Sequence, residues 1–260
     1  MAILLFAVAC FKKPPQRTVA NNGVPIGVNV LLPRSVNNAE SEPAALQEPA
    51  VVISVLENDQ FYVGRERIPK DELGYQISKL LKTRPESNRI VYIAGGNYVE
   101  FGAVLSAIEA VRKEGIKSVA LLVDMQSKTG NAPSVLRVQI PPEPDPNEDL
   151  SNLRPNPLTL VASVSPDLKL ELNREPAGTA SDTSNLSQTL TRIFQQRREL
   201  HAYKRGSETR TDLPEDERVE KTVTVKAWRS NKYGDVVRLV DVVKGAGANP
   251  IILQVDDLPQ

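Results

Sequence analysis

One segment of the sequence is written twice. FGAVLSAIEAVRKEGIKSVALLVD begins at Phe101, and YGDVVRLVDVVKGAGANPIILQVD begins at Tyr233. The two copies align without a gap, and their last residues are Asp124 and Asp256. The matching apolar positions are Val104, Leu105, Ile108 and Val111 in the first copy and Val236, Val237, Val240 and Val243 in the second. Because a preserved spacing of apolar positions means preserved packing, the repeat predicts a duplicated structural unit.

Length and composition limit what such units can be. The chain has 260 residues, enough for two domains that each bury a core of their own. Its 32 basic residues balance 32 acidic ones, so net charge does not favour nucleic acid or an anionic membrane surface as a partner. The single cysteine, Cys10, excludes an internal disulfide framework, and the single histidine, His201, argues against a histidine-rich metal site.

The first unit is expected at residues 51–140, in the order β-β-α-β-α-β. The expected elements are a hairpin of Val51–Leu56 and Phe61–Val63, a helix on Leu73, Ile77, Leu80 and Leu81, a strand from Arg89, a helix of Phe101–Arg112, a strand of Lys117–Val123 and a further strand of Val135–Ile140. Gly115 is expected to end the second helix. Two helices with one apolar face each cover one face of a sheet, which gives a two-layer sandwich.

The second unit, residues 158–257, repeats this order. Its expected elements are a hairpin of Leu158–Val164 and Leu168–Leu172, a helix on Leu186, Leu190, Ile193 and Phe194, a strand of Thr222–Val225, a helix of Tyr233–Lys244 and a strand of Ile251–Val255. This unit is longer, and the extra residues are expected around Pro176–Ser184 and Gly206–Arg218. The predicted fold class is therefore α+β, with two tandem two-layer α/β sandwich domains after a short apolar N-terminus.

Proline-rich segments flank the units. Residues 12–50 are expected to be an extended tether, and residues 141–157 a semi-rigid acidic linker. With such a linker, Val240→Asp should unfold the second unit and leave the first largely intact. Residues 1–11 are apolar but shorter than the roughly 20 residues that cross a bilayer. Three interpretations stay open: part of a membrane helix that begins upstream, a lipoprotein signal ending at Cys10, or a soluble N-terminus.

Few residues suggest chemistry. The glycines from Gly95 follow a strand and precede a helix, but no phosphate-loop pattern surrounds them, and a turn is the better interpretation. Asp124 and Asp256 are interpreted as structural turn residues, and His201 as a surface residue without a nucleophile nearby. Trp228 is interpreted as the anchor of a loop, with partner binding as the alternative.

The basic cluster at residues 197–210 is interpreted as a solvated helix end, because Glu199 and Glu208 are interleaved with it. No catalytic, cofactor-binding or metal-binding residue is predicted, so the chain is not expected to be an enzyme. The opening hairpins also argue against a doubly wound α/β enzyme.

These motifs together resemble the ExbD/TolR biopolymer-transport family. The resemblance is carried by the run VLLPR from Val30 to Arg34 after an apolar segment, by the helix start Phe101-Gly102 and by the helix stop Gly115-Ile116. It covers residues 1–124 nearly continuously. Residues 158–256 resemble a second, more diverged copy, with Tyr233-Gly234 and Gly247-Ala248 at the matching places.

The resemblance implies a single-pass inner-membrane protein of a Gram-negative cell with its folded part in the periplasm. It implies a homodimer that works with an ExbB/TolQ-like proton-channel subunit and a TonB/TolA-like protein, with peptidoglycan as a further contact, and that uses the proton motive force for transport. The family's proton step uses an aspartate in the membrane helix. The first acidic residue here is Glu40, so that aspartate is expected upstream of Met1. The alternative function is a periplasmic binding module, lipid-anchored at Cys10, without the proton step.

Overall fold

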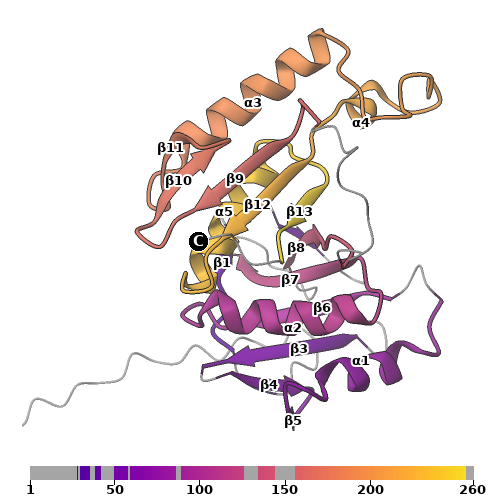
Figure 1. The fold of residues 1–260 in the computed structure, drawn as a ribbon, viewed down its shortest axis with the longest axis vertical. Coiled ribbons are helices and arrows are strands. Elements are labelled where there is room, and N and C mark those ends of the chain that lie inside the picture. Colours follow the sequence, from indigo (N-terminus) through magenta and orange to yellow (C-terminus); the bar gives the residue numbers. More distant parts are fainter. Residues whose placement is uncertain are drawn as a thin grey trace, which may run out of the picture.

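A computed structural model describes residues 28, 30–35, 39–41, 50–57, 59–85, 89–125, 134–143 and 156–255 (Figure 1). We call residues 30–125 the first half and residues 134–255 the second half. The first half contains β1 (Arg34–Ser35), β2 (Glu40–Ser41), β3 (Val51–Leu56), β4 (Gln60–Val63), β5 (Glu66–Ile68), α1 (Leu73–Leu81), β6 (Val91–Gly95), α2 (Phe101–Lys113) and β7 (Ser118–Met125). The second half contains β8 (Ser134–Gln139), β9 (Leu160–Val164), β10 (Lys169–Leu172), β11 (Glu175–Thr179), α3 (Ser184–Glu199), α4 (Glu215–Arg218), β12 (Val223–Ala227), α5 (Tyr233–Gly245) and β13 (Ile251–Leu253).

The two halves have the same strand connections. In the first, β3 pairs antiparallel with β4, β4 antiparallel with β5, and the parallel run β3-β6-β7 continues from there. In the second, β9, β10 and β11 form the same antiparallel set, and β9-β12-β13 forms the same parallel run. The predicted order is present in both halves, with one additional short strand in each, β5 and β11.

The described strands nevertheless form one mixed sheet, not two. Its order is β11-β10-β9-β12-β13-β8-β7-β6-β3-β4-β5, with β1 beside β7 and β2 beside β8. A single hydrophobic cluster also runs through both halves and includes both Ile108 and Val240. The expectation of two separate sandwiches is therefore not confirmed, and the continuous sheet and shared core favour coupled unfolding of the two halves.

Strand β8 makes the connection between the halves (Figure 1). It pairs antiparallel with β7 over Ser118–Val123 and parallel with β13, where Gln139 lies opposite Ile252. In the first half, β1 likewise pairs parallel with the last strand, β7. Both β1 and β8 thus precede a hairpin and lie parallel to the last strand of their own half. The sequence placed this strand in the first unit; in the structure it pairs with the last strand of both halves, along Ser118–Val123 of β7 and at Ile252 of β13.

The helices bury the predicted apolar positions with one exception. Val104, Ile108 and Val111 of α2 are fully buried, as the repeat predicts, and so are the matching residues of α5. In α1, however, Leu80 is 44% exposed, so its assignment to the buried face was wrong.

The extra length of the second half lies mainly in α3 and in residues 200–222. Helix α3 has 16 residues, whereas its counterpart α1 has 9. The segment Pro176–Ser184 contains strand β11 and the start of α3, so it adds little, contrary to expectation.

The segment predicted as a tether packs on the sheet where it is described. Val30 and Leu32 are buried in a second hydrophobic cluster with Tyr92, Ala94 and Leu122, on the face of the sheet opposite the helices. The main chain is held there as well, because Asn97 N donates to Leu31 O (2.7 Å) and Asp124 N donates to Pro33 O (2.8 Å). Residues 30–35 therefore belong to the folded body of the first half.

Candidate functional site

The two halves meet where α2 and α5 begin, and we call this contact the seam. Four backbone amides at the two helix starts donate to carbonyls of the loop before the other helix. The bonds are Phe101 N to Asn231 O (2.8 Å), Tyr233 N to Val99 O (2.8 Å), Gly102 N to Arg229 O (2.8 Å) and Gly234 N to Asn97 O (3.0 Å). Each helix thus receives from the opposite half the carbonyls that its own sequence does not provide.

Neither helix carries a side-chain cap of its own. The residues that precede them, Glu100 and Lys232, make no side-chain capping bond. The first amides of a helix lack partners within the helix and normally bond to a Ser, Thr, Asp or Asn side chain. Here the seam supplies those partners. Glu100 and Lys232 lie opposite each other in an antiparallel bridge, and their charged groups are 3.9 Å apart.

Close approach leaves no room for a side chain at two glycines of the seam, Gly234 and Gly95, and little room at Gly102. A Cβ at Gly234 would lie 2.9 Å from the Asn97 carbonyl oxygen, and one at Gly102 would lie 3.1 Å from Arg229 Cβ. A Cβ at Gly95 would lie 2.6 Å from the ring of Tyr233. The two copies share an aromatic residue followed by glycine at the helix start, and the close contact between the halves explains the glycine.

Tyr233 is the most buried polar group of the seam. Its side chain is fully buried, like Phe101 at the matching position, and its hydroxyl has no hydrogen-bond partner in the described part of the chain. Burial raises the pKa of this hydroxyl far above its ordinary value. A buried hydroxyl without a partner destabilises the folded state by about 1–3 kcal/mol.

A second contact ties the N-terminal segment to α5. Ser35 Oγ donates to Asp241 Oδ1 at 2.5 Å, and both side chains are buried. Lys244 Nζ donates to Glu40 Oε1 at 2.6 Å. Strand β1 therefore contacts α5 of the second half as well as β7, and Glu40 of β2, which pairs with β8, also contacts α5.

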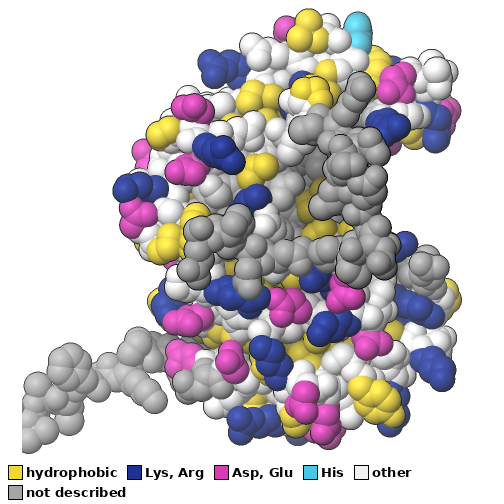
Figure 2. Space-filling view, viewed as in Figure 1, with side chains coloured by type: hydrophobic (Ala, Val, Ile, Leu, Met, Phe, Trp, Pro, Cys, Tyr) yellow, Lys and Arg dark blue, Asp and Glu magenta, His cyan; other side chains and the backbone are white. Residues whose placement is uncertain are grey.

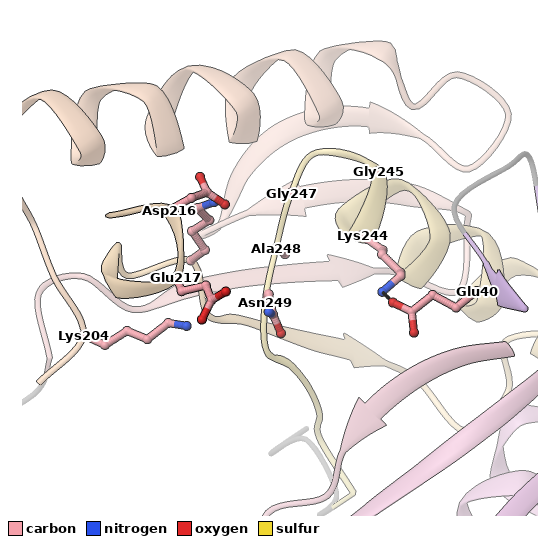
Figure 3. A pocket seen from close by; sticks show the side chains of 10 residues that line it. Glu40, Lys204, Asp216, Glu217, Lys244, Gly245, Gly247, Ala248 and Asn249 are labelled. Atoms are coloured by element: carbon pink, nitrogen blue, oxygen red, sulfur yellow. Dashed lines mark hydrogen bonds and ion pairs between the residues drawn. The ribbon is translucent and has the colours of Figure 1, made fainter. Parts of the chain in front are cut away.

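Beside this contact, a charged pocket of about 390 Å³ lies at the C-terminal end of α5 (Figure 3). Asp216 binds Lys221 at 2.5 Å, and this ammonium, together with the guanidinium of Arg198, holds the pKa of the Asp216 carboxyl below its ordinary value. The side chains of Lys204, Glu217 and Asn249 turn toward the same space in Figure 3. The other charged groups of the pocket are paired, but within the described ranges no ion pair joins Lys204 or Glu217. Among its described residues, the pocket therefore presents one unpaired cation and one unpaired anion to solvent.

The loop from Gly95 is a turn of the seam. The amides of Phe101 and Gly102 already bond to the second half, and Ala103 N bonds to Glu100 O (3.0 Å). No donor is left at these three positions for a phosphate, so the interpretation as a turn is confirmed. Tyr98 of this loop is 63% exposed.

The other residues considered from the sequence lie apart from the charged pocket, and among them Trp228 lies beside the seam. Asp124 is exposed, and Asp256 lies outside the described residues. His201 is exposed and contacts Tyr203 Oη (2.9 Å) and Glu215, as expected of a surface residue. Trp228 is 40% exposed and begins the loop that caps α2.

The basic cluster is only partly a solvated helix end. Arg198 and Arg210 pair with Asp216 and Asp212 at the surface. Arg197, in contrast, is 7% exposed and donates to the backbone carbonyls of Glu220 and Leu158. Burial lowers its pKa, and it fixes α3 to the segment before β12. The charge pattern gave no signal that this arginine alone points inward.

Two further features concern the surface charge and the character of the helices. Basic and acidic side chains are interspersed over the face shown in Figure 2. None of the helices in the described ranges combines the length and apolar character needed to cross a membrane. The sequence run at residues 1–11 lies outside those ranges.

One comparison identifies part of the chain. Residues 17–126 match the family model described as "ExbD: Biopolymer transport protein ExbD/TolR". Among curated proteins, none matches the sequence. The match includes the whole first half and ends one residue after β7.

Proposed function

We propose that this chain, which carries an ExbD/TolR family domain at residues 17–126, is a non-enzymatic subunit of an energy-transducing complex in the inner membrane. In this proposal residues 1–11 belong to a membrane helix, and the two halves form a body in the periplasm. The complex would use the proton motive force to drive transport across the envelope.

The family domain is the observation that carries the proposal. It covers the segment 30–35, which seals the second face of the sheet, together with all elements from β3 to β7. The second half repeats the strand connections of this domain, which supports its assignment as a second unit of the same kind. We place the boundary between the units within residues 126–133.

The partners follow from the family. ExbD/TolR proteins work with channel subunits of the ExbB/TolQ type and with TonB/TolA-like proteins. We propose the same two classes of partner here, with peptidoglycan as a further contact of the periplasmic body. The balanced charge of the chain, 32 basic against 32 acidic residues, supports protein partners over nucleic acid.

The experiment tests the membrane segment and the channel partner together. The full chain with a C-terminal tag would be expressed in its native cell, and the membranes would be washed with alkaline buffer and solubilised in detergent. We expect the chain to remain in the washed membranes and to co-purify with an ExbB/TolQ-type subunit identified by mass. Leu4→Asp with Leu5→Asp should abolish both results, because charges in an apolar segment oppose insertion. Lys12→Gln is the matched control and should change neither.

A periplasmic binding module remains the second candidate, and the pocket beside α5 favours it. Lys204 and Glu217 offer opposite charges in a space of about 390 Å³, a size that accommodates a small ligand. If the chain were recovered without a channel subunit, and if Leu4→Asp with Leu5→Asp left its location unchanged, the binding module would replace the energy-transducing subunit.

A further inference from the structure

We propose that the seam surface of each half is an interface for a second unit of the same kind, and that in this chain the other half occupies it. A single chain would then supply both units of the pair. The inference deepens the proposed function, because it takes the two halves as ExbD/TolR-type units, but its physical argument uses the seam alone.

The first argument is the reciprocity of the contacts. Phe101 corresponds to Tyr233 in the repeat, and Val99 corresponds to Asn231. Phe101 N donates to Asn231 O, and its counterpart Tyr233 N donates to Val99 O, at 2.8 Å in both directions. The two donors match each other in the repeat, and so do the two acceptors. The second pair of bonds, from Gly102 and Gly234, obeys the same rule. An arrangement in which i contacts j and the counterpart of j contacts the counterpart of i is the mark of a twofold axis.

The antiparallel bridge locates this axis. Glu100 and Lys232 occupy the same place in the two copies and lie opposite each other. A pair of equivalent residues that face each other must lie on or beside the twofold axis that relates them. The axis therefore passes between the two helix starts, and the seam has the symmetry of a dimer contact although it lies within one chain.

The second argument is what one half would lack alone. The amides of Phe101 and Gly102 would have no acceptor, since Glu100 makes no side-chain cap. The side chains of Phe101 and Tyr233 are both fully buried at the seam, so separation would bring these aromatic rings toward water. Unsatisfied amides and exposed rings both favour association with another surface of the same kind.

The third argument is that the four helix-start bonds do not use side chains, although one ion pair, Arg229 Nη2 to Glu109 Oε1 at 2.6 Å, also joins the halves. All four bonds join backbone atoms, and glycine stands at the second helical position of each half, where Gly234 has no room for a Cβ and Gly102 has little. The loops differ in sequence, with Gly96-Asn97-Tyr98 in one half and Trp228-Arg229-Ser230 in the other, yet they provide the same carbonyls. A unit with this backbone and an aromatic-Gly helix start would supply the same four backbone bonds.

Paired cysteines at the axis test the inference in the full chain. Residues in an antiparallel bridge have Cα atoms about 4.5–5.5 Å apart, which a disulfide spans without strain. We would combine Glu100→Cys with Lys232→Cys in a Cys10→Ser background and oxidise the detergent-solubilised protein. We expect loss of both free thiols at the mass of one chain. In parallel, a chain with Glu100→Cys alone would be co-expressed with one carrying Lys232→Cys alone, and no mixed disulfide should form.

Two results would overturn the inference. A disulfide between the two singly substituted chains would show that the seam forms between chains. Free thiols in the oxidised double variant, with native melting, would show that the helix starts do not meet. Both outcomes are independent of membrane insertion and of channel binding, so failure here is distinguishable from failure of the proposed function.

Discussion

The two halves are alike on one face of the sheet and differ on the other. Both cover the first face with helices. On the second face, the first half buries Tyr92, Ala94 and Leu122 beneath Val30 and Leu32. The matching positions of the second half are the half-exposed residues Thr224, Lys226 and Gln254. One fold thus occurs once with a sealed second face and once with an open one.

The strand sequences explain this difference. The parallel strands of the first half read as apolar runs, such as VYIAG in β6, because strands buried on both faces have no solvent side. The strand VTVKA of β12 alternates instead, with buried and half-exposed residues in turn. An apolar second face needs a cover, and residues 30–35 provide it. The comparison teaches that the N-terminal segment is a structural part of the half whose strands require it.

The largest effect is expected from a charge placed in the core between the helices and the sheet, which runs through both halves. Ile108 is fully buried in the common core, so Ile108→Asp should destabilise the first half by about 3–5 kcal/mol or unfold it. Because the first half caps α5, the second half should be destabilised as well. Fluorescence of Trp228, the single tryptophan of the chain, reports on the second half during thermal unfolding. An unchanged Trp228 transition, supported by unchanged hydrogen exchange in β10, would mean that the halves are independent.

On the second face, the residues of the two halves can be exchanged at one matching position, Ala94 in the first half and Lys226 in the second. Ala94→Lys places a charge under Val30 and Leu32 and should destabilise the protein by about 3 kcal/mol or more. The reciprocal change, Lys226→Ala, lies on the open face and should shift stability by no more than about 0.5 kcal/mol. Urea unfolding midpoints of the two variants give the test. Equal effects at the two positions would remove the distinction between a sealed and an open face.

The seam glycines should respond with the opposite sign to ordinary helical glycines. Within a helix, Gly→Ala typically stabilises by about 1 kcal/mol. Gly234→Ala should instead destabilise by about 2 kcal/mol, because the new Cβ meets the Asn97 carbonyl oxygen. Gly102→Ala, where the new Cβ meets the Arg229 side chain, should have a smaller effect. Stabilisation by either change in urea unfolding would contradict the close approach of the halves.

The smallest effect is expected at the first helical position, where the first half has Phe101 and the second has Tyr233, so that the side chains differ by one hydroxyl group. Tyr233→Phe recreates the residue of the first half and removes a buried hydroxyl without a partner, so it should stabilise by about 1 kcal/mol at pH 7.

The same variant has a pH signature. Because the pKa of Tyr233 is raised in the folded state, the wild-type protein keeps its full stability below about pH 10, the pKa of an unfolded tyrosine, and loses stability as the pH rises above it. Tyr233→Phe should lose less over that range. Some loss remains, since burial also raises the pKa of Tyr92. Parallel alkaline melting curves for the two proteins would show that the hydroxyl is solvated.

Periodicity was sufficient to predict the elements and most of the core. Leu73, Ile77 and Val104 are buried where the helical spacing placed them. Leu80 satisfied the same spacing and is exposed, because α1 is a short helix near the end of the sheet and covers less of it. The spacing identifies a face, but tertiary contact decides how wide that face is.

The seam could not be predicted, because backbone carbonyls cap its helices and leave no motif. Two weak signals were present in the sequence. Both helices begin with an aromatic residue followed by glycine, and both are preceded by Glu100 or Lys232 where a capping side chain is usual. Together they indicate helix starts that need an external acceptor and tolerate close approach. The proline content of residues 12–50 outweighed the apolar pair Val30 and Leu32, so their role as a cover was missed.

A contact made by two like surfaces joins two units and no more. Each half offers its helix start to the other, and both surfaces are then used, whereas a head-to-tail contact would leave one surface free for the next member of a chain. The seam therefore closes on itself at two units and cannot propagate into a filament. A third tandem copy would find no helix start available, so growth of an assembly built from this protein must use other surfaces, such as the outer strands β5 and β11 at the two ends of the sheet.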